Sequence, residues 1–565
     1  MKKGVIIGVL VILFGIGAGA YYYFKGSDKH LQLVPKNAVF VGNIDFKSVL
    51  TKADMDKVKE MQWFKDLQGK MKEEASDSPK DKKAMEVFEH PFSSGVNIMS
   101  DVYFFGAMYG EAFVGAMVFD IKDEDQFKES ILKVKPEAKI VNEKDYKAVY
   151  DGSEMALAWN GTGAVVATVY DYELRDSLKG FLSSTFARKK EESVLANTFF
   201  QEYARSKKDM SVFMNFNEFD KLTSALTRDN PFGGMMYGSM SGYLKGNYVW
   251  SNLEFQDNKI LFTTVRKTDS DDKDAAKPGD WLDPKGLSEE HINSLTQKDI
   301  YALFAIALNS EKVFAYYDKI PMISMGKAQI AAAMDMDVKS LEKIFGGEFS
   351  FALVGFDKPA VDSSALAMAE AIKAEDDSEY YGSDNYEDYP AYHNPMDDYP
   401  VPVFTFNFSS NNKEGVQKLL AKYGITKTAD GYYTYPLERN MNTYLIENKF
   451  GYTVTNSVEV AKKMATDGKL GPPPARVADL VKGKSSAVFF DMVLDHYPLE
   501  IRNSMSKEMG ERNYNAFATY MQLFKDVTGS GNASNSEVSI NLNEGKGNSL
   551  YRLLAQADVA YKMVK

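Results

Sequence analysis

Three short motifs in the second half of the chain contain the residue types of a serine hydrolase. Ser324–Lys327 opens a predicted helix and places a lysine one helical turn after a serine. Ser383–Asn385 and Lys427–Ala429 follow in that order. A serine needs a neighbouring base to act as a nucleophile, and a lysine one turn away can accept its proton.

The order of these motifs is similar to that of penicillin-recognising serine enzymes, but two departures weigh against such a site. Ala429 stands where those enzymes have glycine, and Ser383–Asn385 fall in an acidic stretch that is unsuited to hold a catalytic group in place. Ser504–Lys507 repeats the serine–lysine spacing elsewhere. We therefore predict no catalytic residue, and an exported serine hydrolase of the penicillin-recognising type is the alternative function.

Other reactive and metal-binding patterns are missing from the sequence. The chain has no cysteine, and its five histidines have no i, i+4 pair (His30, His90, His291, His393 and His496). No nucleophile elbow, phosphate-binding loop or dinucleotide fingerprint follows a predicted strand. The sequence thus predicts no cofactor and no metal site. A net charge of −12 also argues against nucleic acid as a partner.

One acidic stretch, Ala374–Pro400, contains no lysine or arginine. Its carboxylates repel one another, which favours a solvated loop inserted between two strands. We predict a plain hairpin insertion, with a docking loop for a basic protein partner and a Ca²⁺ site as the alternatives, although the EF-hand spacing is missing. The acidic residues are Glu375, Asp376, Asp377, Glu379, Asp384, Glu387, Asp388, Asp397 and Asp398.

The N-terminus predicts attachment to a membrane. Lys2 and Lys3 precede an uncharged run, Gly4–Phe24, which as a helix would span about 31 Å, the thickness of a hydrocarbon core. Tyr21–Tyr23 end the run, as in an aromatic belt, and the lysines should stay cytoplasmic. We expect a single transmembrane helix in the inner membrane with the body in the periplasm. The alternative is a signal peptide cleaved after Ala18–Ala20, which would release a soluble periplasmic or surface-exposed protein.

Glycines recur along one stripe of this predicted anchor helix. Gly8, Gly15 and Gly19 return to nearly the same azimuth, and Gly15 and Gly19 form a small-xxx-small pair. Such a stripe lets two helices approach closely, so the anchor could form a homo-oligomer, although glycine is also common in membrane helices.

The exported body repeats one local pattern, in which an apolar strand, a helix-capping polar residue and an amphipathic helix follow one another. The pattern predicts an α+β fold with mainly antiparallel sheets. Its instances are Val39–Ile44 before Asp45, Met117–Ile121 before Phe127, Val212–Phe216 before Asn217, Leu303–Leu308 before Asn309, Phe404–Phe408 before Val416, and Val488–Leu494 before Asp495.

The order of predicted elements in residues 31–268 recurs in residues 295–565, which indicates two tandem, similar α+β modules. Residues 1–30 form the anchor or signal segment, residues 269–294 the linker, and residues 374–400 the loop insertion. Each module is predicted to close on a hairpin, Tyr248–Val265 in the first and Val538–Leu554 in the second.

The segment Leu33–Leu50, LVPKNAVFVGNIDFKSVL, resembles the opening of an uncharacterised family of Bacteroidota envelope proteins, domain of unknown function 4836. The resemblance implies an exported, membrane-attached protein but no activity and no functional residues. Many members look like lipoproteins, whereas this chain has no cysteine to lipidate. We therefore expect a non-enzymatic envelope protein that acts as a binding or structural component of a membrane-associated assembly.

Overall fold

The computed structural model describes residues 28–76, 94–97, 99–152, 154–169, 177–226, 244–269, 278–295, 300–357, 400–436 and 442–565. The chain divides into two compact units, each described separately below. Unit 1 comprises Met1–Asp280 with Ser534–Lys565, and unit 2 comprises Trp281–Ala533. Helices and antiparallel strands are mixed in both, so the predicted α+β class is confirmed.

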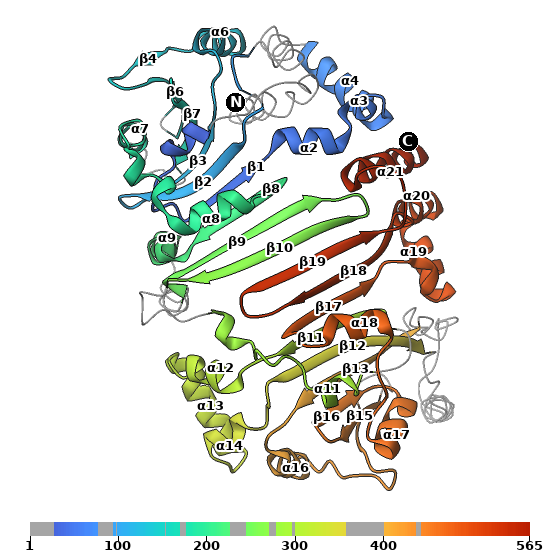
Figure 1. The fold of residues 1–565 in the computed structure, drawn as a ribbon. Helices are drawn as coiled ribbons and strands as arrows, with labels where there is room; N and C mark the ends of the chain where they lie inside the picture. Colours follow the sequence, from blue (N-terminus) through green and yellow to red (C-terminus); the bar gives the residue numbers. More distant parts are fainter. Residues whose placement is uncertain are drawn as a thin grey trace, which may run out of the picture. The chain divides into compact units, whose positions relative to one another are not determined.

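Unit 1 joins the first half of the chain to its C-terminal segment (Figure 1). Its elements are η2 (Asp28–Leu33), β1 (Phe40–Ile44), α2 (Phe46–Ala53), α3 (Met55–Val58), α4 (Gln62–Ser76), β2 (Val102–Tyr109), β3 (Ala112–Phe119), α6 (Glu124–Val134), β4 (Val141–Asn142), β5 (Lys147–Asp151), β6 (Met155–Asn160), β7 (Gly163–Val169), α7 (Ser177–Phe186), η5 (Lys190–Glu192), η6 (Val194–Ala196), α8 (Thr198–Ser206), β8 (Met210–Asn215), η7 (Phe216–Glu218), α9 (Phe219–Leu226), β9 (Asn247–Phe255), β10 (Lys259–Thr268), η8 (Pro278–Trp281, whose last residue belongs to unit 2), β19 (Asn535–Leu542) and α21 (Ser549–Val564).

The strands of unit 1 pair in the order β4-β5-β6-β7-β3-β2-β1-β8-β9-β10-β19, with antiparallel neighbours. Helices cover both faces of part of this sheet. Consecutive residues of β6 show this, because Ala158 packs in the cluster with α7 and α8, and Trp159 in the cluster with α6.

Unit 2 contains the remaining elements. They are α11 (Glu289–Ile292), β11 (Ala302–Ala307), α12 (Ser310–Tyr317), α13 (Pro321–Ala333), α14 (Val338–Glu342), β12 (Glu348–Asp357), β13 (Val401–Ser409), α16 (Lys413–Lys422), β14 (Tyr433–Pro436), β15 (Asn442–Glu447), β16 (Gly451–Thr455), α17 (Val458–Asp467), α18 (Ala475–Val481), β17 (Ser486–Asp491), η10 (Leu494–His496), α19 (Leu499–Met509), α20 (Glu511–Met521) and β18 (Phe524–Gly531).

The strands of unit 2 pair in the order β14-β15-β16-β13-β12-β11-β17-β18, again with antiparallel neighbours. Taken in order across the sheet, these eight strands correspond one to one to β5-β6-β7-β3-β2-β1-β8-β9 of unit 1, and the two sets also follow the same order along the chain. The two units therefore share one strand order. Val477 and Val481 of α18 lie in the main core of unit 2 with Leu295, which follows α11, and α16 packs on the opposite face near Tyr452.

Several predicted elements differ from the structure. The expected hairpin Val538–Leu554 is wrong, because only β19 is a strand and Leu550 and Leu554 lie on helix α21. Asn548 caps that helix, and the i, i+4 spacing of the two leucines places them on one helical face. Two expected helix caps are also wrong, since Asn215 caps η7 in place of Asn217, and Pro498, not Asp495, precedes α19.

The module boundaries also differ from those predicted at residues 268, 295 and 565. Ser534–Lys565 fall in unit 1, because β19 pairs with β10 from Lys259 to Val265 and α21 lies along α2. The expected linker 269–294 is partly structural, because Leu287 is buried in the main core of unit 2.

Candidate functional site

One face of the unit 2 sheet carries a group of phenylalanines that we call the aromatic face: Phe304, Phe351, Phe404, Phe406 and Phe490. Cross-strand pairing brings them together, since Phe304 lies opposite Phe351 and Phe351 opposite Phe406. The Phe351 and Phe404 rings are stacked with centroids 6.1 Å apart. The aromatic face therefore runs across β11, β12 and β13, with Phe490 on the adjoining strand β17.

Side chains that alternate with these rings form the main core of unit 2. Leu303 and Ala305 flank Phe304 in the sequence and are buried, whereas Phe304 is 51% exposed. Phe351 and Phe490 are 44% and 45% exposed. Scattered exposed apolar residues are ordinary, so the grouping of half-exposed rings on one face of the sheet is the feature that needs a physical reason. Covering three such rings would contribute on the order of 2–4 kcal/mol to binding.

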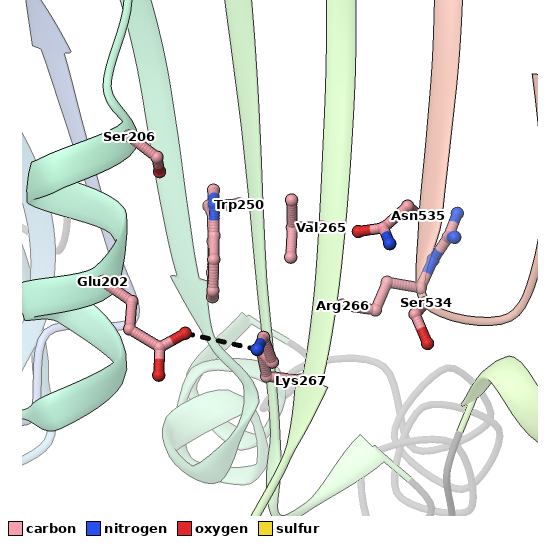
Figure 2. Close-up of a pocket in the computed structure, with 8 residues that line it drawn as sticks. All are labelled: Glu202, Ser206, Trp250, Val265, Arg266, Lys267, Ser534 and Asn535. Atoms are coloured by element: carbon pink, nitrogen blue, oxygen red, sulfur yellow. Dashed lines mark ion pairs between the residues drawn. The ribbon is translucent and has the colours of Figure 1, made fainter.

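A polar pocket of about 360 Å³ lies in unit 1. It is lined by Glu202 and Ser206 of α8, Trp250 of β9, Val265, Arg266 and Lys267 of β10, and Ser534 and Asn535 at the start of β19. Figure 2 shows Glu202 and Lys267 directed toward one another, and their charged atoms are 3.3 Å apart. The indole of Trp250 lies edge-on between Ser206 and Val265.

The groups of this pocket can bind but show no arrangement for catalysis. Trp250 is 3% exposed, and its Nε1–H has no hydrogen-bond partner in the described structure. Burial lowers the pKa of Arg266, which nevertheless stays a cation at neutral pH.

The structure does not assemble the predicted serine hydrolase motifs. Lys327 is only 12% exposed and forms ion pairs with Asp318 and Glu342. Burial alone would lower its pKa, but the two paired carboxylates outweigh burial and raise the pKa of Lys327. A lysine held protonated in this way is a poor base for Ser324. Ser383–Asn385 lie outside the described residues. The Thr428 hydroxyl donates a hydrogen bond to the Tyr432 carbonyl.

A different set of reactive residues meets inside unit 2, and no motif in the sequence predicts it. His291 Nε2 lies 2.8 Å from Ser350 Oγ, and His291 Nδ1 lies 3.3 Å from a carboxylate oxygen of Glu348. These are the residue types of a catalytic triad. However, His291 and Ser350 are 0% exposed, and the Phe450 ring packs against the imidazole at 4.9 Å. Ser350 also accepts a hydrogen bond from Asn407, so the group joins the strands rather than facing a substrate.

Several predicted functional residues lie outside the part of the chain that the structure describes. They are the acidic loop residues from Glu375 to Asp398 and the anchor glycines Gly8, Gly15 and Gly19. Within the described ranges, no helix is long and apolar enough to cross a membrane. In the same ranges, no group of three or more His, Asp or Glu side chains is placed to hold a metal ion.

Comparison with known proteins identifies the family. Residues 31–550 match the domain of unknown function DUF4836. The chain belongs to the DUF4836 family. The resemblance of Leu33–Leu50 to this family is thereby confirmed and extends over most of the chain.

Comparisons beyond the DUF4836 family add little. No curated protein matches the sequence. Among solved structures, crystal form I of TP0453 is similar at 10% identity and a TM-score of 0.24, covering 43% of this chain and 80% of that one. Crystal form IV of TP0453 has the same identity and TM-score, covering 44% and 83%. A likeness at this TM-score supports no inference about fold or function.

Proposed function

We propose that this DUF4836 protein is a non-enzymatic envelope protein that binds a protein partner through the aromatic face of unit 2, as a component of a membrane-associated assembly. The observation that carries the proposal is the exposure of Phe304, Phe351 and Phe490 on one sheet face. The reactive groups support it as well, because the Ser350–His291 pair is buried and Lys327 is held by two carboxylates.

The proposal also includes a membrane anchor and a duplicated body. The uncharged run Gly4–Phe24 would hold the chain in the inner membrane, with the stripe Gly8, Gly15 and Gly19 available for self-association. The shared strand order of the two units supports a tandem duplication of one α+β module. The acidic loop Ala374–Pro400 would add a second contact for a basic region of the partner.

The partner surface is tested with full-length tagged protein purified from detergent-solubilised membranes. Replacing Phe304, Phe351 and Phe490 together by serine should lower the melting temperature by several degrees, because the buried half of each ring is lost, so circular dichroism must first show that the variant is folded at the assay temperature. The same variant should lose the co-purifying partner, and the isolated partner should rebind only the wild type. Phe262→Ser, at a 39% exposed ring of unit 1, is the matched control and should keep the partner. Equal recovery with the triple variant would contradict the proposal.

Topology and enzymatic activity need separate measurements. External protease on spheroplasts should digest the body and leave a small membrane-bound stub, whereas protection of the whole chain would contradict export. A mature N-terminus at Tyr21 would show a cleaved signal peptide instead of an anchor. Labelling of the protein by fluorescent penicillin or a fluorophosphonate would show that the serine hydrolase alternative is correct.

A further inference from the structure

Strand register fixes the floor of the pocket in unit 1. Trp250 of β9 lies directly opposite Val265 of β10, and Val265 lies directly opposite Asn535 of β19. Residues that lie opposite one another in an antiparallel sheet point to the same face. Trp250, Val265 and Asn535 therefore form one row across three strands, and all three line the pocket (Figure 2).

Helix α8 and the end of β10 form the wall and the mouth of the pocket. Glu202 and Ser206 are four residues apart on α8, so they lie on one face of the helix. Lys267 comes two residues after Val265 and shares its face of the sheet. The ion pair between Glu202 and Lys267 joins the helix to the sheet, and the two side chains are 47% and 45% exposed. The pair therefore stands at the mouth, where solvent enters.

The floor holds a hydrogen-bond donor with no protein acceptor. Trp250 is 3% exposed, and its Nε1–H has no partner in the part of the chain that the structure describes. The indole N–H groups of Trp63 and Trp159 are also buried without an acceptor, but these two residues do not line the pocket. A buried donor of this kind is stabilised by an acceptor that a bound molecule supplies.

Donors and acceptors are mixed around the pocket. The Ser206 hydroxyl donates to the Tyr203 carbonyl, which leaves the Ser206 oxygen able to accept a hydrogen bond. The Glu202 carboxylate accepts, and the Lys267 ammonium donates, beyond the contact that they make with each other. A hydroxyl group both donates and accepts, so a ligand with several hydroxyl groups can use every one of these positions.

The charges at the mouth favour a neutral ligand. Glu202 and Lys267 cancel one another. Arg266 alternates with Val265 and Lys267 along β10, so its side chain leaves the strand on the other face of the sheet. A carboxylate or ammonium ligand would have to compete for one member of the ion pair, whereas a neutral ligand leaves the pair intact.

We propose that this pocket binds a neutral sugar of monosaccharide size. Its volume of about 360 Å³ equals the liquid volume of about twelve water molecules, which is about the number of non-hydrogen atoms in a hexose. Trp250 and Val265 contact the C–H groups of the sugar ring, and the hydroxyl groups reach Glu202 and Lys267. For a ligand of this size we expect a dissociation constant of about 1 mM or weaker. The site lies in unit 1 and does not depend on the aromatic face of unit 2.

The four tryptophans of the chain allow a direct test by nuclear magnetic resonance. Full-length protein with ¹⁵N-labelled tryptophan is kept in a detergent that carries no sugar, and Trp250→Phe assigns the Trp250 indole signal. Glucose, galactose, mannose and N-acetylglucosamine are titrated separately into the millimolar range. At least one of them should shift the Trp250 signal saturably, while the signals of Trp63, Trp159 and Trp281 stay in place. No saturable shift with any of the four sugars would overturn the proposal.

Variants at the mouth locate the binding. Glu202→Ala and Lys267→Ala should each weaken binding of that sugar at least about ten-fold, because a hydrogen bond to a charged group is lost. Glu124→Ala is the matched control, since Glu124 of α6 also forms a helix-to-strand ion pair, with Lys147 of β5 at 2.6 Å, and it should keep the wild-type affinity. Unchanged affinity in both mouth variants would overturn the proposal.

Glucuronate separates a neutral-sugar site from an anion site, because it has the ring of glucose with a carboxylate added. It should bind more weakly than the neutral sugar, since its charge meets the Glu202 carboxylate. Tighter binding of glucuronate, strengthened further by Glu202→Ala, would make the pocket an anion site and overturn the proposal.

Discussion

The helical segments that follow the first strand of each unit differ in how much of their apolar surface is covered. In unit 1, Val58 and Met61 are buried under α21, whereas in unit 2 Met322 and Met325 face solvent. The cover of Val58 and Met61 comes from an element more than 480 residues away in the chain. An apolar side chain on such a helix therefore becomes core only where another segment covers it.

The largest expected effect comes from placing a charge at a buried methionine of unit 1, compared with an exposed methionine of unit 2. Met61→Lys should destabilise unit 1 by about 3 kcal/mol or more, because a buried ammonium group would have no partner there. Met325→Lys should change the stability of unit 2 by no more than about 0.5 kcal/mol in dilute solution. Differential scanning calorimetry of the two variants checks the contrast. Equal losses would mean that Met325 is as well packed as Met61.

The sequence predicted local elements well where a cap and an apolar period coincide. Asp45, Asp123 and Asn309 each accept a backbone hydrogen bond at the start of the helix expected there. The predicted final hairpin is wrong because the spacing of Leu550 and Leu554 is compatible with either a strand or a helix. Only the packing of these leucines against α2–α4 selects the helix.

The candidate sites were harder to predict. Alternation along β11 separates Leu303 and Ala305 from Phe304, but it does not say which face another element covers. The buried group of His291, Glu348 and Ser350 forms only when β12 packs beside α11, and no spacing in the sequence marks it.

The next effect concerns this buried polar group, which distinguishes the core of unit 2. His291→Ala should destabilise unit 2 by about 2–4 kcal/mol, because Ser350 loses a bond of 2.8 Å and a cavity remains. Urea unfolding, followed by a spectroscopic signal that reports on unit 2, measures the loss in free energy of unfolding. His496→Ala is the matched control, because the exposed imidazole of His496 should matter less than the buried one of His291. A loss below about 1 kcal/mol for His291→Ala would show that the contact is not structural.

The same group predicts how unit 2 responds to acid. Burial raises the pKa of Glu348, but hydrogen bonds from His291 and Ser288 outweigh it, so the pKa lies below its ordinary value of 4.5. A carboxylate with a lowered pKa stabilises the fold above the unfolded pKa, and the stabilisation is lost as the pH falls through the folded value. Unit 2 should therefore lose stability as the pH falls below 4.5 and through the lower pKa of Glu348 in the folded protein. Glu348→Gln should flatten this acid limb of the pH–stability curve, and an unchanged limb would contradict the assignment.

The smallest expected effect concerns Asp45, where unit 1 should respond to pH in the opposite direction. Burial raises the pKa of Asp45 above its ordinary value of 3.8, and the nearby carboxylates Asp101 and Asp209 raise it further. A carboxyl group with a raised pKa contributes stability below the unfolded pKa, and that contribution is lost as the pH rises through the folded value.

Asp45→Asn places in unit 1 the residue that unit 2 has at the aligned cap, Asn309. Asparagine caps a helix as well as aspartate does, and it carries no charge to repel Asp101 or Asp209. The variant should therefore keep the stability of unit 1 at pH 7 or raise it by up to about 1 kcal/mol, and its stability should no longer fall as the pH rises from about 4. Chemical unfolding of wild type and variant across this pH range measures both effects, with Asn309→Asp as the reciprocal exchange. A loss of more than 1 kcal/mol at pH 7 would show that the Asp45 charge stabilises unit 1, and the two caps would then not be equivalent.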